Sequence, residues 1–78
     1  MSRETILSKV KEILIDILDN QKLHLDEDTL FVNIDGWDSI AFVTLIASLE
    51  TEYGISMDLK EIQKISVVKE LINLMQSL

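Results

Sequence analysis

One serine in the sequence stands where its side-chain oxygen could be modified covalently. Ser39 follows Asp38, and the turn pair Asp35-Gly36 comes just before them. Asp38 is a good helix N-cap, so its carboxylate can accept a first-turn N–H and leave the Ser39 hydroxyl free. A helix start also presents unpaired N–H groups and partial positive charge, which suits an attached phosphate. The pattern predicts an accessible serine that can carry a phosphate group.

Catalysis by the chain itself is poorly supported. A nucleophilic serine needs a base and an oxyanion site, yet the single histidine, His24, lies in a non-helical region before Ser39. The glycine-flanked serine of a hydrolase elbow is also missing. Asp35 and Asp38 could act as an acid and a base, but turn and cap roles explain them more simply. We therefore predict a chain that is no enzyme and a serine that is another enzyme's substrate.

Metal binding is not predicted either. The sequence has no cysteine, and His24 has no second histidine to share a metal with, so it is interpreted as a surface loop residue. A calcium loop with Gly36 in its sixth position would begin at Phe31 and have Phe42 in its twelfth, where Asp and Glu are needed.

Size and charge set the class of protein. A chain of 78 residues that is 47% hydrophobic has material for one small core, so we expect a single domain over residues 1–78. The formal charge of −7 argues against nucleic acid as a partner. No apolar run approaches the ~18 residues of a membrane span. We expect a cytoplasmic monomer that binds neither nucleic acid nor membrane.

The first half of the chain predicts one long helix and a long connection. Apolar side chains recur every three or four positions over residues 3–19, and Ser2 can cap this helix. The helical period is lost from residue 20 to residue 37, where we expect Asp28 to open a short helical turn through Phe31. Six apolar side chains are expected to anchor the connection: Leu23, Leu25, Leu30, Phe31, Ile34 and Trp37.

The second half predicts three helices, which completes an all-α bundle of three main helices plus one short helix. The second long helix runs from Asp38 to Glu52 or Tyr53, and Gly54 ends it. Its inward face is expected to be Val43, Leu45, Ile46 and Leu49. Ser56 or Asp58 caps a short helix with Leu59 and Ile62. Ser66 caps a last helix whose apolar stripe is Val68, Leu71, Ile72 and Met75.

The segment around Ser39 resembles the modification site of acyl carrier proteins, whose Asp-Ser-Leu motif stands here as Asp38-Ser39-Ile40. The run Gly36-Trp37-Asp38-Ser39 and the later Leu49-Glu50 also look like carriers of polyketide and related pathways. Length, acidity and helix order match over nearly the whole chain. The resemblance implies a carrier with 4′-phosphopantetheine on Ser39, which tethers acyl, polyketide or aminoacyl groups as thioesters and delivers them to partner enzymes.

The partners that the resemblance implies are a phosphopantetheinyl transferase, acyl-loading enzymes, and acyl-transfer or condensing enzymes. The implied recognition face is Asp38, Ile40, Ala41, Thr44, Ser48, Glu50, Met57 and Glu61. Fatty-acid carriers usually have acids where Ala41 and Thr44 stand, so a specialised polyketide, nonribosomal peptide or lipid pathway is predicted. Ile40 gives partners an apolar contact instead.

Two alternatives remain open from the sequence. Five apolar residues could line a cargo cleft or simply belong to the core: Leu45, Ile46, Leu49, Leu59 and Ile62. The chain could also be a small helical adaptor that binds partners without any prosthetic group. Loss of function in Ser39→Ala would separate a carrier from an adaptor.

Overall fold

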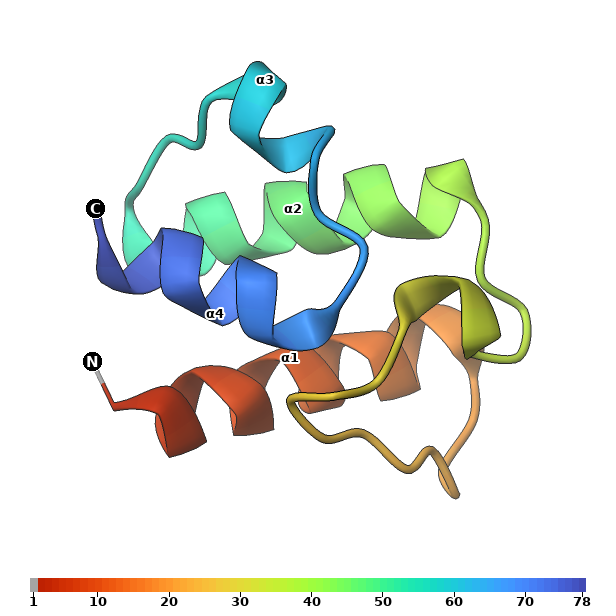
Figure 1. The fold of residues 1–78 in the computed structure, drawn as a ribbon. Helices are drawn as coiled ribbons and strands as arrows, with labels where there is room; N and C mark the ends of the chain where they lie inside the picture. The colour runs from red at the N-terminus through yellow and green to blue at the C-terminus, as the bar shows by residue number, and fades with distance from the viewer. Residues whose placement is uncertain (1) are drawn as a thin grey trace.

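The computed structural model describes residues 2–78 as four α-helices and one 3₁₀ turn. In chain order they are α1 (Arg3–Leu18), η1 (Phe31–Asn33), α2 (Ser39–Tyr53), α3 (Leu59–Ile62) and α4 (Val68–Gln76). In Figure 1, α2 and α4 run opposite to α1, and the short α3 lies over α2. The predicted all-α bundle of three main helices plus one short helix is confirmed.

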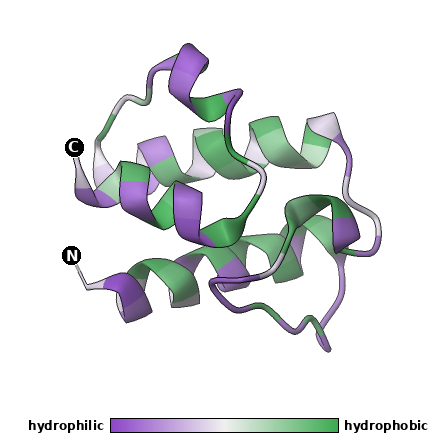
Figure 2. Cartoon of the chain, viewed as in Figure 1, coloured by the Kyte–Doolittle hydropathy of each residue, from purple (hydrophilic) through white to green (hydrophobic). Residues whose placement is uncertain are grey.

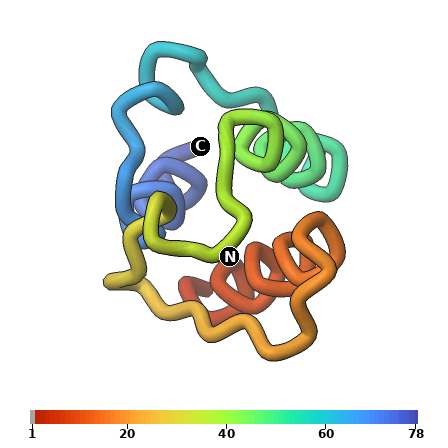
Figure 3. The backbone as a smooth tube through the Cα atoms, turned by 90° about the vertical axis from the view of Figure 1, so that its right-hand side faces the viewer, coloured from red at the N-terminus to blue at the C-terminus, as the bar shows by residue number. Residues whose placement is uncertain are grey.

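The core lies between the three long helices. Figure 3 looks down the bundle from the end at which α2 begins and shows α1, α2 and α4 around a common centre. The largest fully buried side chains come from these helices and are Ile6, Val10, Leu14, Leu45, Leu49, Val68, Leu71, Ile72 and Met75. The hydropathy colouring in Figure 2 alternates green and purple around α1 and α4, as amphipathic helices require.

One residue predicted for the inner face of α2 points outward. Val43 is 66% exposed, whereas Leu45, Ile46 and Leu49 are buried as expected. Residues two positions apart on a helix lie about 200° apart around its axis, so Val43 and Leu45 cannot share a face. Ala41, one turn before Leu45, takes the inward position instead.

Most helix ends follow the predicted capping residues. The Ser2 hydroxyl accepts the Thr5 N–H at 3.1 Å, and the Asp58 carboxylate accepts the Lys60 N–H at 2.9 Å. Gly54 ends α2 in the left-handed conformation, with φ of 63°. These contacts fix α1 and α2 within a residue of their predicted bounds, and α3 begins directly after Asp58, one of its two predicted caps.

The start of α4 is the exception, because Val67 and not Ser66 occupies the N-cap position. The Glu70 carboxylate accepts the N–H groups of Ser66 and Val67, at 2.9 and 3.0 Å. These hydrogen bonds hold the pKa of Glu70 below its ordinary value. The prediction that Ser66 caps α4 is therefore wrong: Glu70 accepts the two N–H groups before the helix, and the carbonyls of Thr29 and Glu27 accept the first-turn N–H groups of Val68 and Lys69, at 3.0 and 2.9 Å.

The connection between α1 and α2 is anchored by buried side chains and by the backbone. Leu23, Leu25, Phe31 and Ile34 are buried and Trp37 is half-buried, as predicted, but Leu30 is exposed. Its backbone instead forms an isolated bridge with Val67 at the start of α4. Such a pairing fixes the chain without burying the side chain.

The helical turn of this connection begins later than predicted. Asp28 donates its N–H to the Asp26 carboxylate at 2.9 Å, within a turn, and η1 starts only at Phe31. The Asp26 side chain competes for the N–H that an earlier helical turn would have used.

Arg3 ties both ends of the described chain to this connection. Its guanidinium lies 2.6 Å from the Glu27 carboxylate and also donates to Asn73 and Gln76, at 2.7 and 2.9 Å. The hydrogen bond from Arg3 holds the pKa of Glu27 below its ordinary value. The end of the bundle opposite to the start of α2 is thereby closed.

Candidate functional site

Ser39 is the first residue of α2 and is exposed. The preceding Asp38 is extended, with φ of −153°, and its carboxylate accepts the Ala41 N–H at 2.7 Å. The Asp38 carbonyl accepts the next N–H, that of Phe42, at 3.1 Å. Asp38 is therefore the N-cap, as predicted.

The first two N–H groups of α2 are left over. Across residues 2–78, neither the N–H of Ser39 nor that of Ile40 has a hydrogen-bond partner, and the Ser39 hydroxyl also has none. Two free donors at the positive end of a 15-residue helix can receive phosphate oxygens. The residues present therefore fit a phosphate ester on Ser39.

An aromatic cluster holds the start of α2 in place. The rings of Phe31 and Trp37 are stacked, with centroids 4.8 Å apart, and the Phe42 ring lies 5.9 and 5.6 Å from them. The left-handed turn at Gly36, with φ of 84°, leads the chain into this cluster. Trp37 and Phe42 flank Asp38 and Ser39 in sequence, so the cluster fixes the direction in which the serine is presented.

Two open grooves meet at Ser39. One, of about 500 Å³, lies between α2 and α3, and its apolar lining is Phe42, Val43, Ile46, Ala47, Met57, Leu59 and Ile62. The other, of about 540 Å³, lies between the loops on either side of the serine and is lined by Val32, Trp37, Asp38, Phe42, Gln63 and Ile65. A group attached to Ser39 therefore begins inside both grooves.

The first groove settles which of the five cleft candidates are accessible. Ile46, Leu59 and Ile62 line it, whereas Leu45 and Leu49 are fully buried in the core. Helical spacing could not separate these two groups, since the position of α3 decides which side of α2 is covered.

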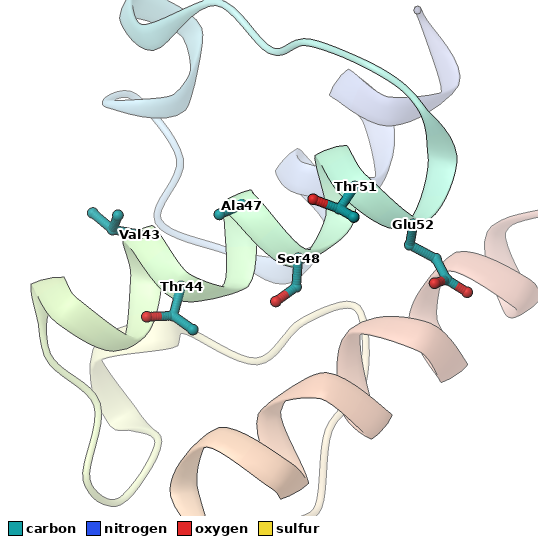
Figure 4. A pocket seen from close by; sticks show the side chains of 6 residues that line it. All are labelled: Val43, Thr44, Ala47, Ser48, Thr51 and Glu52. Atoms are coloured by element: carbon teal, nitrogen blue, oxygen red, sulfur yellow. The ribbon is translucent and has the colours of Figure 1, made fainter.

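A shallow hollow follows the outer side of α2 (Figure 4). It is lined by Val43, Thr44, Ala47, Ser48, Thr51 and Glu52. Glu52, the one charged residue of this set, pairs with Lys9 on α1 at 3.0 Å. The centre of the exposed side of α2 is consequently uncharged.

The residues predicted to face partners divide into two groups. Asp38, Ile40, Thr44 and Glu61 are exposed, and Ser48 and Glu50 are partly exposed. Ala41 is only 4% exposed, so its placement on a contact surface is wrong, whereas Met57, although only 6% exposed, lines the α2–α3 groove as Ile46 and Ile62 do. Ala41 packs inward one turn before Leu45, and the Met57 N–H donates to the Glu50 carboxylate at 2.8 Å.

The part of the chain that the structure describes shows no metal site and no catalytic surroundings for His24. His24 is exposed on its loop, 3.5 Å from the Asp26 carboxylate, as expected of a surface histidine. No three His, Cys, Asp or Glu side chains among residues 2–78 are placed to hold a metal ion. Between Ser2 and Leu78 no helix has both the length and the apolar character to cross a membrane.

Comparison with known proteins gives one family. A family model described as the phosphopantetheine attachment site matches residues 8–75. The chain is 33% identical over 72 residues to the acyl carrier protein of Thermotoga maritima, covering 92% of this chain and 89% of that protein. It is 34% identical over 77 residues to the acyl carrier protein of Lactobacillus acidophilus, covering 99% and 96%.

Two solved structures are similar to this chain in fold. The holo acyl carrier protein of Geobacter metallireducens is 34% identical and superposes with a TM-score of 0.80, covering 91% of this chain and 82% of that one. A putative acyl carrier protein from Mycobacterium tuberculosis, 23% identical over 96% and 95% of the two chains, shares the fold with a TM-score of 0.76. The chain therefore belongs to the acyl carrier protein family, whose members bear a covalent phosphopantetheine and carry acyl groups to partner enzymes without catalysing reactions themselves.

Proposed function

We propose that Ser39 is the residue that bears the phosphopantetheine. The observation that carries this assignment is the exposed, unbonded Ser39 hydroxyl beside two free N–H groups at the start of α2. The other end-of-helix serines are occupied: Ser2 bonds Thr5, Ser66 donates to Glu70, and Ser77 donates to the Leu74 carbonyl.

Loading requires one substitution at phosphorus. The Ser39 Oγ forms a bond to the phosphorus next to the pantetheine of coenzyme A, and the bond from that phosphorus to the bridging oxygen breaks. Adenosine 3′,5′-bisphosphate leaves, and the hydroxyl proton passes to a base of the transferase. The free N–H groups of Ser39 and Ile40 would hold the phosphate oxygens of the ester. When bound, the group supplies a thiol that holds cargo as a thioester.

The groove between α2 and α3 supports a sheltering role for this chain. Its walls are largely apolar, and Ser39 lies in its lining, so a hydrocarbon portion of a tethered cargo can leave water there. Glu50 belongs to the same lining and holds the segment before α3 through the Met57 N–H. We therefore propose cargo with an apolar portion.

The neutral first turns of α2 support a specialised pathway. No acidic side chain lies in the first turn, so partners that select carboxylates find few on this side. We propose a polyketide, nonribosomal peptide or lipid pathway, with a phosphopantetheinyl transferase and loading, transfer or condensing enzymes as partners.

We further propose that residues 1–78 form one carrier domain acting as a cytoplasmic monomer. Family membership displaces the alternative of an adaptor without a prosthetic group.

The test is the intact mass after incubation with coenzyme A and a broad-specificity phosphopantetheinyl transferase. Wild type is expected to gain one phosphopantetheine, and Ser39→Ala none. Ser48→Ala, which removes a partly exposed serine of the same helix, is the matched control and should gain it as wild type does. Equal gain in Ser39→Ala would refute the assignment.

A further inference from the structure

The second of the two grooves at Ser39 contains side chains that the fold leaves partly unused. We call this hollow of about 540 Å³ the loop groove. Besides Ser39, its lining is Val32, Trp37, Asp38, Phe42, Gln63 and Ile65. These residues come from η1, from the start of α2 and from the segment that follows α3. Two of them, Trp37 and Gln63, have groups that a ligand can contact.

Trp37 borders the loop groove with the part of its ring that the core does not cover. One side of the ring stacks on Phe31, with centroids 4.8 Å apart, and Phe31 is only 2% exposed. Trp37 itself is half-buried, and its indole N–H has no hydrogen-bond partner among residues 2–78. The ring therefore offers a ligand an apolar surface held rigidly from behind.

Gln63 places a polar side chain where the two grooves meet. It is exposed and lines both the loop groove and the α2–α3 groove. Its backbone N–H ends α3 by donating to the carbonyls of Leu59 and Glu61, but its side-chain amide has no partner from residue 2 to residue 78. Such an amide can still donate and accept hydrogen bonds.

The carboxylates that line the two grooves are already engaged. The Asp38 carboxylate accepts the Ala41 N–H at 2.7 Å in the loop groove. The Glu50 carboxylate accepts the Met57 N–H at 2.8 Å in the α2–α3 groove. Gln63 is therefore the polar side chain best placed to bind a group that extends from Ser39.

The phosphopantetheine arm has apolar and polar groups in a matching order. Directly after its phosphate come a carbon that bears two methyl groups, then a hydroxyl and an amide, which together form the pantoyl part. Small-molecule sites usually combine apolar walls with a few placed polar groups. The loop groove has both, whereas the lining of the α2–α3 groove is largely apolar and suits a hydrocarbon.

We propose that the loop groove holds the pantoyl part of the arm, with the two methyl groups against the Trp37 ring and the pantoyl amide hydrogen-bonded to the Gln63 side chain. The proposal rests on the assignment of Ser39. The arm begins in the lining of this groove, so its first groups are the ones that meet Trp37 and Gln63. The α2–α3 groove is then left to the apolar portion of the cargo.

The experiment uses protein loaded from coenzyme A whose pantoyl methyl groups are isotopically labelled. Intact mass and peptide mapping first establish how many arms are attached and at which serine. Nuclear Overhauser effects from the labelled methyl groups then report which side chains lie beside them. Trp37 is the only tryptophan, so its ring signals and its fluorescence each report on this one residue.

Wild type is expected to show Overhauser effects from the pantoyl methyl groups to the Trp37 ring. Quenching of Trp37 fluorescence by acrylamide should fall about twofold on loading, because a groove and its ligand cover one another. Gln63→Leu keeps a similar size without the hydrogen bonds and should weaken both effects. Gln21→Leu is the control, since Gln21 is an exposed glutamine outside both grooves, and it should match wild type. Circular dichroism verifies that both variants are folded.

Overhauser effects to Met57 or Leu59 in place of Trp37 would put the pantoyl part in the α2–α3 groove and overturn the proposal, while Ser39 stays assigned. The absence of any effect to Trp37, on an arm mapped to Ser39, would overturn it equally. Wild-type behaviour of Gln63→Leu would refute the role given to Gln63. An arm that is not gained, or that maps to another residue, would remove the assignment of Ser39 and this proposal with it.

Discussion

Asp38 and Ser39 are neighbours with separate tasks at the start of α2. The Asp38 carboxylate takes up the Ala41 N–H, so the fold does not need the Ser39 hydroxyl. A serine at the N-cap would use its hydroxyl oxygen to accept a backbone N–H, as Ser2 does at the start of α1. The one-residue offset between cap and serine keeps the reactive oxygen free.

Removing the cap should therefore cost stability without removing the modified oxygen. Asp38→Ala is expected to lower the free energy of unfolding by about 1 kcal/mol. Asp38→Asn should lose much less, because asparagine caps nearly as well. Urea denaturation measures both. Equal losses in the two variants would contradict the capping role.

The Arg3–Glu27 pair makes stability depend on pH. Its hydrogen bond lowers the pKa of Glu27 in the folded state, so the unfolded chain binds the proton more readily. The stabilising effect is complete above the ordinary glutamate pKa of about 4.3 and is lost as pH falls through the lower folded pKa.

Glu27→Gln should accordingly unfold at lower urea than wild type at about pH 7, and the gap should close toward about pH 2. Glu4→Gln is the matched control, since Glu4 pairs with no residue from 2 to 78. A gap of the same size at both pH values would show that the ion pair is not its cause.

Single residues on the inner or outer side of α2 were the hardest to predict. Ala41 belongs to a contact surface by resemblance, but it lies one turn before Leu45 on α2 and is buried with it. Val43 could be excluded from the core by counting 100° per residue from Leu45. The remaining exposed candidates, above all Ile40, are where the sequence placed them.

At the scale of elements, α2 is a helix with unequal sides. Leu49 is fully buried between the long helices, whereas Val43 on the same helix faces outward. Leu49→Ala is expected to cost about 2–5 kcal/mol, since a cavity remains in the core. Val43→Ala should be nearly neutral, because little packing is lost and alanine favours the helix. Thermal unfolding followed by circular dichroism compares them, and similar losses would contradict the orientation of α2.

Helices were predictable from the sequence to within a residue or two because their signals are local. Ser2, Asp38, Gly54 and Asp58 act through backbone groups a few positions away. The long connection was less predictable, because Leu30 pairs with Val67, a residue that is distant in sequence. The start of α4 was mispredicted because its first N–H groups are accepted by the carbonyls of Thr29 and Glu27, which are distant in sequence.

Over the whole molecule, the two ends of the bundle are built differently. Near the chain termini, Arg3 fastens the ends with hydrogen bonds to Glu27 and α4. At the other end, aromatic packing holds the start of α2, and Ser39 lies in the lining of two grooves. The hydrogen bonds of Arg3 thus secure the fold at the end of the bundle opposite to Ser39.

The central claim is that phosphopantetheine is attached to Ser39, and peptide mapping tests it most directly. Trypsin releases residues 23–60 as one peptide, which holds three serines, Ser39, Ser48 and Ser56. After loading from coenzyme A, fragmentation of this peptide should place the added mass on Ser39 alone. Added mass on Ser48, on Ser56 or on a peptide outside residues 23–60 would contradict the account.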